Sequence, residues 1–184
     1  RDAQLSRGLG VVYKRQEIIE LLLKYDSSIV GISNTEIKDN NGNYSIHYAI
    51  NCKNLNALKL FKKYNKSFNK FDSDNNSLLH LAVKSNSNEI FNFILENSND
   101  YDNLNIYGEN QVRYAVNHNN LEFLSILYEK NVNVNNQDFK NEITPIMYSI
   151  ILDNIEIFDY LLDKSNLNLQ DNLGNNILHY VIIY

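Results

Sequence analysis

The chain is poor in several residue types that mark particular protein classes. Its 184 residues include one cysteine, one proline, six glycines and no tryptophan. A single cysteine excludes an internal disulfide framework, and no stretch approaches the roughly 20 consecutive apolar residues that cross a bilayer. Hydrophobic residues still make up 43% of the chain, which is enough to bury a substantial core. These features predict an intracellular, most simply cytoplasmic, folded protein. Asparagine is abundant, a bias that fits AT-rich coding DNA.

The motifs of common catalytic and metal centres are also absent from the sequence. There is no Gly-x-x-x-x-Gly-Lys phosphate loop and no Gly-x-Ser-x-Gly elbow. Residues 72–76 resemble the start of a calcium loop, but that loop needs glycine at its sixth position and glutamate at its twelfth. Ser77 and Val83 stand at those positions. The sequence therefore predicts no enzymatic activity, no cofactor and no bound metal.

The first sixteen residues differ from the rest of the chain. Residues 12–16, Val-Tyr-Lys-Arg-Gln, resemble the translated transposon end used in preparing sequencing libraries. The segment has no helical period, whereas a repeating pattern begins directly after it. We expect residues 1–16 to be a non-native, adapter-derived segment and the natural sequence to begin at Glu17. An ordinary flexible N-terminus is the alternative.

A period of 33 residues organises the remaining chain. An aspartate or asparagine recurs at this spacing, and a glycine or asparagine follows three residues later. The first set is Asp39, Asp72, Asn105, Asp138 and Asp171, and the second is Gly42, Asn75, Gly108, Asn141 and Gly174. Glycine or asparagine permits a positive φ in a tight turn, and the preceding side chain can accept hydrogen bonds from the turn. Each period is therefore expected to begin with a projecting hairpin.

Two short apolar helices are predicted in each period. First helices begin in residues 45–49, 78–82, 112–115, 145–149 and 177–181, and second helices begin in 55–58, 88–91, 121–124 and 155–158. Residues 17–22 supply one more second helix. Because one such unit cannot bury its apolar face alone, neighbouring units must stack. The fold class predicted is all-α, a helical solenoid.

These motifs resemble the ankyrin repeat, whose pattern runs Asp-x-x-Gly, then Thr-Pro-Leu-His, alanine, and a second helix ending in Leu-Leu. Residues 144–147 (Thr-Pro-Ile-Met) and 79–82 (Leu-His-Leu-Ala) match it most closely. The resemblance implies an ankyrin-type solenoid with β-hairpin or turn loops over residues 17–184. Its units are a half repeat at 17–37, repeats at 38–70, 71–103, 104–136 and 137–169, and a partial repeat at 170–184.

Some positions depart from the ankyrin pattern. Arg113 and Met147 replace the histidine, and Ser149 and Val181 replace the alanine. An insertion of about six residues is expected within residues 27–37, where insertions map to surface loops. The 137–169 repeat has one extra residue near position 141 and lacks one before position 171. These changes alter turns but leave the period intact.

Three histidines recur at the start of first helices. Equivalent positions on stacked repeats lie about 8–10 Å apart, whereas zinc ligands lie roughly 2.0–2.1 Å from the ion, so one ion cannot hold two of them. We expect His47, His80 and His179 to bond to turn backbone. His118 is expected to be an exposed residue between helices.

The charge of the chain changes sign along its length. Residues 17–70 contain eight lysines and five acidic residues, a net charge of +3, whereas residues 71–184 contain five basic and sixteen acidic residues, a net charge of −11. The negative part argues against nucleic acid and favours a partner protein with a basic patch. A solvated acidic surface that only maintains solubility is the alternative.

The resemblance implies a protein–protein interaction module, because ankyrin partners usually contact the hairpin tips and the exposed side of the first helix. The matching positions are Asn40, Asn41, Asn43, Asn51, Ser73, Asp74, Asn76, Lys84, Ile106, Tyr107, Glu109, Asn117, Phe139, Lys140, Asn172 and Leu173. Four of these are apolar tip residues, Ile106, Tyr107, Phe139 and Leu173, which we expect to anchor a partner. Packing of each over a neighbouring hairpin is the alternative.

The expected function is therefore that of a monomer that binds another protein and contacts neither nucleic acid nor membrane. Two alternatives stay open. The array could target or recruit substrates for a larger, truncated enzyme such as a kinase or acyltransferase. It could also belong to a viral or pathogen effector that recruits host machinery.

Overall fold

The computed structural model describes residues 14–26, 34–98 and 101–184. The segment expected to be non-native lies outside these ranges except for residues 14–16. Most of the insertion expected within residues 27–37 also lies outside them. Residues 14–26 form a helix that runs through position 16. It is followed by a short 3-10 helix, η1 (Asn34–Glu36).

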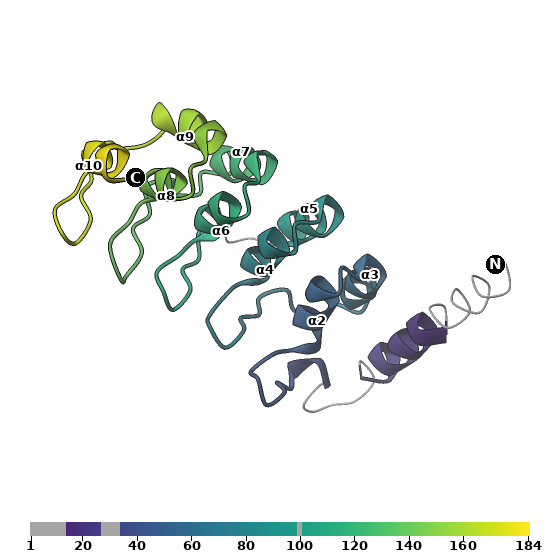
Figure 1. Cartoon of the computed structure of the whole chain (residues 1–184). Coiled ribbons are helices and arrows are strands. Elements are labelled where there is room, and N and C mark those ends of the chain that lie inside the picture. Colours follow the sequence, from purple (N-terminus) through teal and green to yellow (C-terminus); the bar gives the residue numbers. More distant parts are fainter. Residues whose placement is uncertain (1–13, 27–33, 99–100) are drawn as a thin grey trace, which may run out of the picture.

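Paired helices form two rows along the chain. The first helices are α2 (Ser45–Asn51), α4 (Leu78–Ser85), α6 (Gln111–Asn117), α8 (Pro145–Ile151) and α10 (Ile177–Ile183). The second helices are α3 (Leu55–Lys63), α5 (Asn88–Asn97), α7 (Leu121–Glu129) and α9 (Ile155–Leu162). Loops project from one side of the first helices, and the second helices form the opposite layer (Figure 1). The expected all-α solenoid is confirmed.

The projecting loops are turns rather than extended strands. Within the described ranges, one isolated β bridge joins Phe71 and Ser77. The helices that follow begin at capping side chains: the Ser77 hydroxyl accepts from the His80 N–H, and the Asn110 side chain accepts from the Arg113 N–H. Such caps satisfy backbone donors that have no partner inside the helix.

Asparagine carries much of the turn chemistry that glycine carries in other proteins. Asn86 directly follows the first helix α4 with a φ of +50°. Asn119, Asn65 and Asn131 lie two residues beyond the ends of α6, α3 and α7, with φ of +49°, +52° and +60°. Asparagine tolerates this left-handed region better than other residues with a side chain. The scarcity of glycine is therefore compatible with a fold that needs many tight turns.

Small residues lie where the first helices meet. Ala82, Ala115 and Ser149 are fully buried, and the Ser149 hydroxyl donates to the Ile146 carbonyl at 2.7 Å. Neighbouring first helices pack directly against one another along the array. Small side chains at these positions permit this close approach. Across the described ranges, no helix has the length and apolar character needed to cross a bilayer.

Candidate protein-binding surface

Each hairpin tip is held by one side-chain oxygen. In the 71–103 repeat, Asp72 Oδ1 accepts hydrogen bonds from the N–H groups of Asp74 at 2.9 Å and Asn76 at 2.8 Å. The residue three positions after Asp72, Asn75, has a φ of +59°. Equivalent pairs of bonds occur at Asp39, Asn105 and Asp171. The turn predicted from the 33-residue period is confirmed.

The tip of the 137–169 repeat is one residue longer than the others. Asp138 N–H donates to the carbonyl of Ile143, five residues on, whereas Asp72 N–H donates to Asn76, four residues on. The positive φ falls at Glu142, at +59°. The extra residue is confirmed, but Asn141 does not occupy the glycine position as the simple 33-residue spacing indicated.

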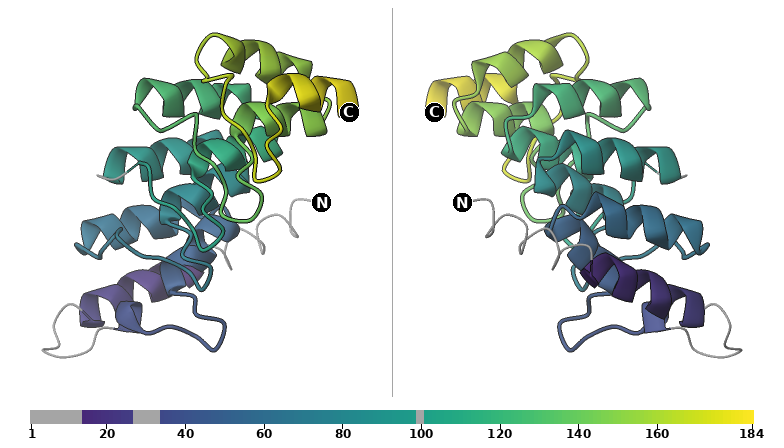
Figure 2. Two further views of the ribbon diagram at one scale, coloured as in Figure 1. Left: turned by 90° about the vertical axis from the view of Figure 1, so that its left-hand side faces the viewer. Right: turned by 90° about the vertical axis from the view of Figure 1, so that its right-hand side faces the viewer.

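Consecutive tips are hydrogen-bonded to one another. Ile106 N–H donates to the Asp74 carbonyl at 2.9 Å, and Phe139 N–H donates to the Tyr107 carbonyl at 2.8 Å. In the same way, Asn172 N–H donates to the Asn141 carbonyl of the preceding hairpin at 3.0 Å. We call residues 73–75, 106–108, 139–142 and 172–174 the tip ridge. Its parts lie side by side along one edge of the molecule (Figures 1 and 2).

The four apolar tip residues are all exposed. Their relative exposures are 52% for Ile106, 53% for Tyr107, 66% for Phe139 and 82% for Leu173. Phe139 also packs on its neighbour, because a Cβ added to Gly108 would lie 2.4 Å from Phe139 Cδ1. Phe139 therefore has features of both alternatives, packing on a neighbouring hairpin and exposure to a partner: it lies against the preceding hairpin and still exposes most of its surface.

Most of the other residues selected from the sequence are accessible. Those exposed are Asn40, Asn41, Asn51, Ser73, Lys84, Asn117, Lys140 and Asn172, and those partly exposed are Asn43, Asp74 and Glu109. Asn76 is the exception, with 4% of its surface exposed. Its Oδ1 accepts from Asn105 Nδ2 at 3.1 Å and from the Tyr114 hydroxyl at 2.8 Å. The assignment of Asn76 to the accessible surface is therefore wrong, because its amide joins two repeats.

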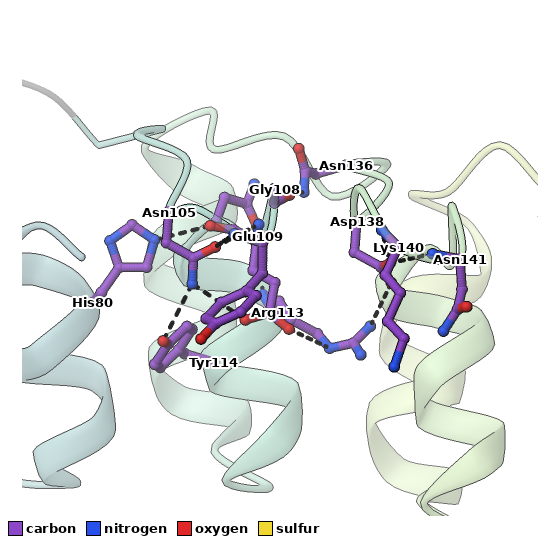
Figure 3. Close-up of polar contacts among 12 residues, drawn as sticks. His80, Asn105, Gly108, Glu109, Arg113, Tyr114, Asn136, Asp138, Lys140 and Asn141 are labelled. Atoms are coloured by element: carbon purple, nitrogen blue, oxygen red, sulfur yellow. Dashed lines mark hydrogen bonds and ion pairs between the residues drawn. The ribbon is translucent and has the colours of Figure 1, made fainter. Parts of the chain in front are cut away.

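Glu109 is also committed to contacts within the array. Its carboxylate accepts from Asn105 Nδ2 at 3.2 Å, and its Oε1 lies 3.7 Å from Arg113 Nε. Arg113 also approaches Asp138 of the next repeat, with Nη1 to Oδ2 at 3.9 Å. Figure 3 shows the guanidinium between these two carboxylates. The Arg113 guanidinium, through these two carboxylates, joins the 104–136 repeat to the 137–169 repeat.

Sequence reasoning missed a set of tyrosines that tie the first helices to the tips. The Tyr114 hydroxyl donates to Asn76, the Tyr180 hydroxyl donates to Asp171 Oδ2 at 2.8 Å, and the Tyr48 hydroxyl donates to Asp39 Oδ2. Burial raises the pKa of Tyr114 to about 12. The sequence contains a spacing that indicates these contacts, because each of these tyrosines follows a tip aspartate or asparagine by nine residues.

The histidines bond to turn backbone as expected. Nδ1 of His47, His80 and His179 accepts from the N–H of the residue three positions earlier, at 3.3, 3.1 and 3.2 Å. Because Nδ1 accepts, His80 Nε2 carries the proton and donates to the Glu109 carbonyl of the next repeat at 3.1 Å. His118 is exposed after α6, as predicted. Within the described part of the chain, no three His, Cys, Asp or Glu side chains converge as a metal site.

Burial of His80 makes stability depend on pH. Its pKa is lowered from 6.5 to about 4, mainly because burial disfavours the charged ring. Between pH 7 and pH 4 the unfolded chain therefore binds more protons, and stability falls as the pH falls. We expect urea unfolding at pH 5 to give a free energy about 2 kcal/mol smaller than at pH 7 from this group alone. His80→Gln should weaken that pH dependence, and an unchanged difference between the two pH values would contradict the assignment.

Acidic side chains gather on the second helices rather than on the tip ridge. The exposed ones are Glu89 and Glu96 in α5, Glu122 and Glu129 in α7, and Glu156 and Asp159 in α9, with Asp163 directly after α9. These helices form the layer away from the loops (Figure 1). The negative charge of residues 71–184 therefore lies largely on a different face from the exposed apolar tips.

Helix pairs that stack in one direction, joined by projecting turns, define a class of helical repeat proteins. The family model for ankyrin repeats (three copies) matches residues 9–105 and 112–184, so the chain belongs to the ankyrin repeat family. It is 32% identical over 169 residues to the ankyrin repeat protein L371 of Acanthamoeba polyphaga mimivirus. That match covers 91% of this chain and 22% of the relative, so the chain spans less than a quarter of that protein's length.

Proposed function

We propose that this chain binds a partner protein along the tip ridge and the adjoining side of the first helices. Ankyrin repeats in general serve protein–protein interaction, and proteins built from them are typically not enzymes. The observation that carries the proposal is the run of exposed apolar side chains in consecutive tips. Ile106, Tyr107, Phe139 and Leu173 are between 52% and 82% exposed. Apolar and aromatic side chains of this kind dominate the energy of many interfaces.

The backbone of the ridge supports this function because it is already ordered. The bonds from Ile106 to Asp74 and from Phe139 to Tyr107 fix neighbouring tips relative to each other. A preorganised surface loses less conformational entropy when a partner binds. The ridge therefore presents its apolar side chains at fixed spacing, in contrast to a set of independent loops.

The chemistry of the ridge favours an apolar segment of the partner. Of its acidic residues, Asp74 is partly buried, and Glu142 lies close to the exposed cation Lys140 in sequence. Within the described part of residues 71–184, most exposed carboxylates lie on α5, α7 and α9. A partner with a basic patch is thus a proposal for the second-helix face, whereas the ridge suits aliphatic or aromatic side chains.

The tip ridge can be tested with matched alanine variants. A photo-crosslinking residue at position 107 would capture partners, with the same residue at position 128 on α7 as the control. For a captured partner, Tyr107→Ala with Leu173→Ala should raise Kd about 30-fold, equivalent to about 2 kcal/mol. Tyr128→Ala removes a 40%-exposed tyrosine from the second-helix layer and should leave Kd unchanged. The proposal would be wrong if the unmodified chain, the Tyr107→Ala/Leu173→Ala variant and the Tyr128→Ala variant bound the partner with the same Kd and gave the same circular dichroism spectrum.

A second candidate function is that of a recruiting array within a longer viral or pathogen protein. The observation that favours it is the similarity to a mimivirus protein of which this chain spans 22%. The test is the coding sequence on both sides of the region. A catalytic domain in the same reading frame would make the repeats its recruiting element, whereas further repeats followed by a stop codon would favour an independent interaction protein.

A further inference from the structure

Three exposed apolar side chains of the tip ridge form a continuous surface in the middle of the array. The Asp74 carbonyl accepts from Ile106 N–H at 2.9 Å, and the Tyr107 carbonyl accepts from Phe139 N–H at 2.8 Å. These two bonds place Ile106 and Tyr107 between Asp74 on one side and Phe139 on the other. We call Ile106, Tyr107 and Phe139 the apolar patch.

The apolar patch has a neighbouring tip on each side. The tips at residues 73–75 and 172–174 both belong to the described chain and are hydrogen-bonded to the tips that carry the patch. The three side chains of the patch are nevertheless 52–66% exposed. Their exposure is therefore a property of the interior of the array and does not depend on either of its ends.

Negative charge gathers on one flank of the apolar patch. Burial raises the pKa of the Tyr114 hydroxyl to about 12, because it disfavours the charged form. The carboxylates of Glu109, Asp72 and Asp74 add to this rise, so all three act on the same region. Glu109 lies 3.7 Å from Arg113, and Asp72 accepts hydrogen bonds within its tip. Within the described ranges, the Asp74 carboxylate makes no hydrogen bond or ion pair.

The opposite flank of the patch carries balanced charge. The tip continues beyond Phe139 with Lys140 and, two residues later, Glu142, and both are exposed. Their opposite charges offset each other. Tyr114 and Lys140 lie on opposite sides of Arg113 in Figure 3. The apolar patch therefore has one negative flank, at Asp74, and one flank that is close to neutral.

We propose that the partner segment that binds the apolar patch carries a lysine or arginine beside its apolar residues, and that this basic side chain lies at Asp74. The apolar residues of the segment cover the patch, and its cation pairs with a carboxylate that the described chain leaves unpaired. Because complementary charge fixes the orientation of a partner, the segment binds with its basic end toward the 73–75 tip.

This inference rests on the proposed binding at the tip ridge and specifies the chemistry of the partner. It concerns one basic residue next to apolar residues, on the loop side of the molecule. A partner with a basic patch on the second-helix face would be a separate contact.

Selection of peptides tests the preference without a known partner. Short random peptides displayed on phage would be selected on the immobilised chain and sequenced. We expect lysine or arginine beside a pair of apolar residues about threefold more often than in the unselected library, a size typical of one exposed ion pair. Selection on Asp74→Asn should remove this enrichment. Selection on Asp74→Lys should replace it by an enrichment of aspartate and glutamate.

Asp153→Lys is the matched control for Asp74→Lys. It makes the same change of charge at an exposed residue between α8 and α9, at the end of α8 that lies away from the tips. The backbone there accepts lysine, because Asp153 has a φ of +53° and Lys53, in the corresponding turn, has a φ of +52°. Asp153→Lys should select the same peptides as the unmodified chain. A reversal as large as that of Asp74→Lys would mean that net charge alone sets the preference, and would overturn the proposal.

Binding of the selected peptides to the Tyr107→Ala/Leu173→Ala variant separates this inference from the proposed function. Peptides that bind this variant as well as the unmodified chain occupy another surface, which would overturn both. Peptides that lose binding to it but show no enrichment of basic residues would overturn only the preference for a cation at Asp74. Selection of no peptide at all would count against both. Circular dichroism of each variant checks that it is folded.

Discussion

Replacing Phe123 by alanine is expected to lower the free energy of unfolding by about 3–5 kcal/mol. Phe123 in α7 stacks on Phe91 in α5 with ring centroids 4.1 Å apart, and both rings are fully buried. The substitution removes apolar contacts and leaves a cavity between two repeats. Since proteins are stable by about 5–15 kcal/mol, the loss would be a large part of the total.

The same substitution should also change how the array unfolds. Stability in repeat proteins is approximately a sum of repeat and nearest-neighbour interface contributions. Weakening the α5–α7 interface should separate the unfolding of the repeats before it from those after it. Urea titration followed by circular dichroism should therefore give one transition for the unmodified chain and two for Phe123→Ala. Phe123→Leu, which keeps most of the volume, should cost about 1 kcal/mol and keep one transition. A single, slightly shifted transition for the alanine variant would show that the interface contributes little.

The sequence predicted features that depend on chemistry within one repeat. The hydrogen bonds that Asp72 accepts from Asp74 and Asn76, and the bond that His80 accepts from Ser77, join residues two to four positions apart. Such contacts repeat wherever the motif repeats, so a 33-residue period is enough to locate them. The extra residue at the fourth tip was also visible, because the spacing from Asp138 to the following helix grows by one. The position of its positive φ, Glu142, depended on how the longer turn closes.

Contacts between repeats could not be predicted in the same way. The surplus asparagine looked like a consequence of coding bias, yet several asparagines join neighbouring repeats. Asn75 Nδ2 donates to the Leu104 carbonyl at 2.9 Å, and Asn120 Nδ2 donates to Asn86 Oδ1 at 2.7 Å. The burial of Asn76 has the same origin, because Asn105 and Tyr114 come from the next repeat. These partners depend on the rotation between repeats, which the one-dimensional pattern does not specify.

Arg113 is the departure from the repeat pattern with the largest structural consequence. It stands where His80 and His179 bond to turn backbone, but its side chain turns toward the following repeat. Its guanidinium lies over the Tyr148 ring between Glu109 and Asp138, with 7% of the residue exposed. Burial lowers the pKa of Arg113, although the two carboxylates and Tyr148 oppose that effect. Among the described residues, Nε and Nη1 have no hydrogen-bond partner, so the charge is held by ion pairing and stacking.

We expect Arg113→Met to destabilise the chain by about 3 kcal/mol, because it leaves the buried Asp138 carboxylate without its cation. Asp138→Asn keeps the Oδ1 acceptor that the tip needs, as Asn105 shows in the preceding repeat. The variant that carries both Arg113→Met and Asp138→Asn no longer has an unpaired carboxylate at position 138. A double-mutant cycle should therefore give a coupling energy of about 1–2 kcal/mol between the two positions.

The exposed pair of Lys63 and Glu20 supplies the control for this cycle. Its side chains are 60% and 41% exposed, and such surface pairs contribute little to stability. Both cycles can be measured by urea unfolding at pH 7 in low and high salt. Salt should reduce the Lys63–Glu20 coupling and leave most of the Arg113–Asp138 coupling, since buried pairs are screened less. Equal couplings in the two cycles would mean that Arg113 acts mainly through its packing on Tyr148. A larger coupling for Arg113 would show that its charge, placed where other repeats carry histidine, joins the 104–136 repeat to the next.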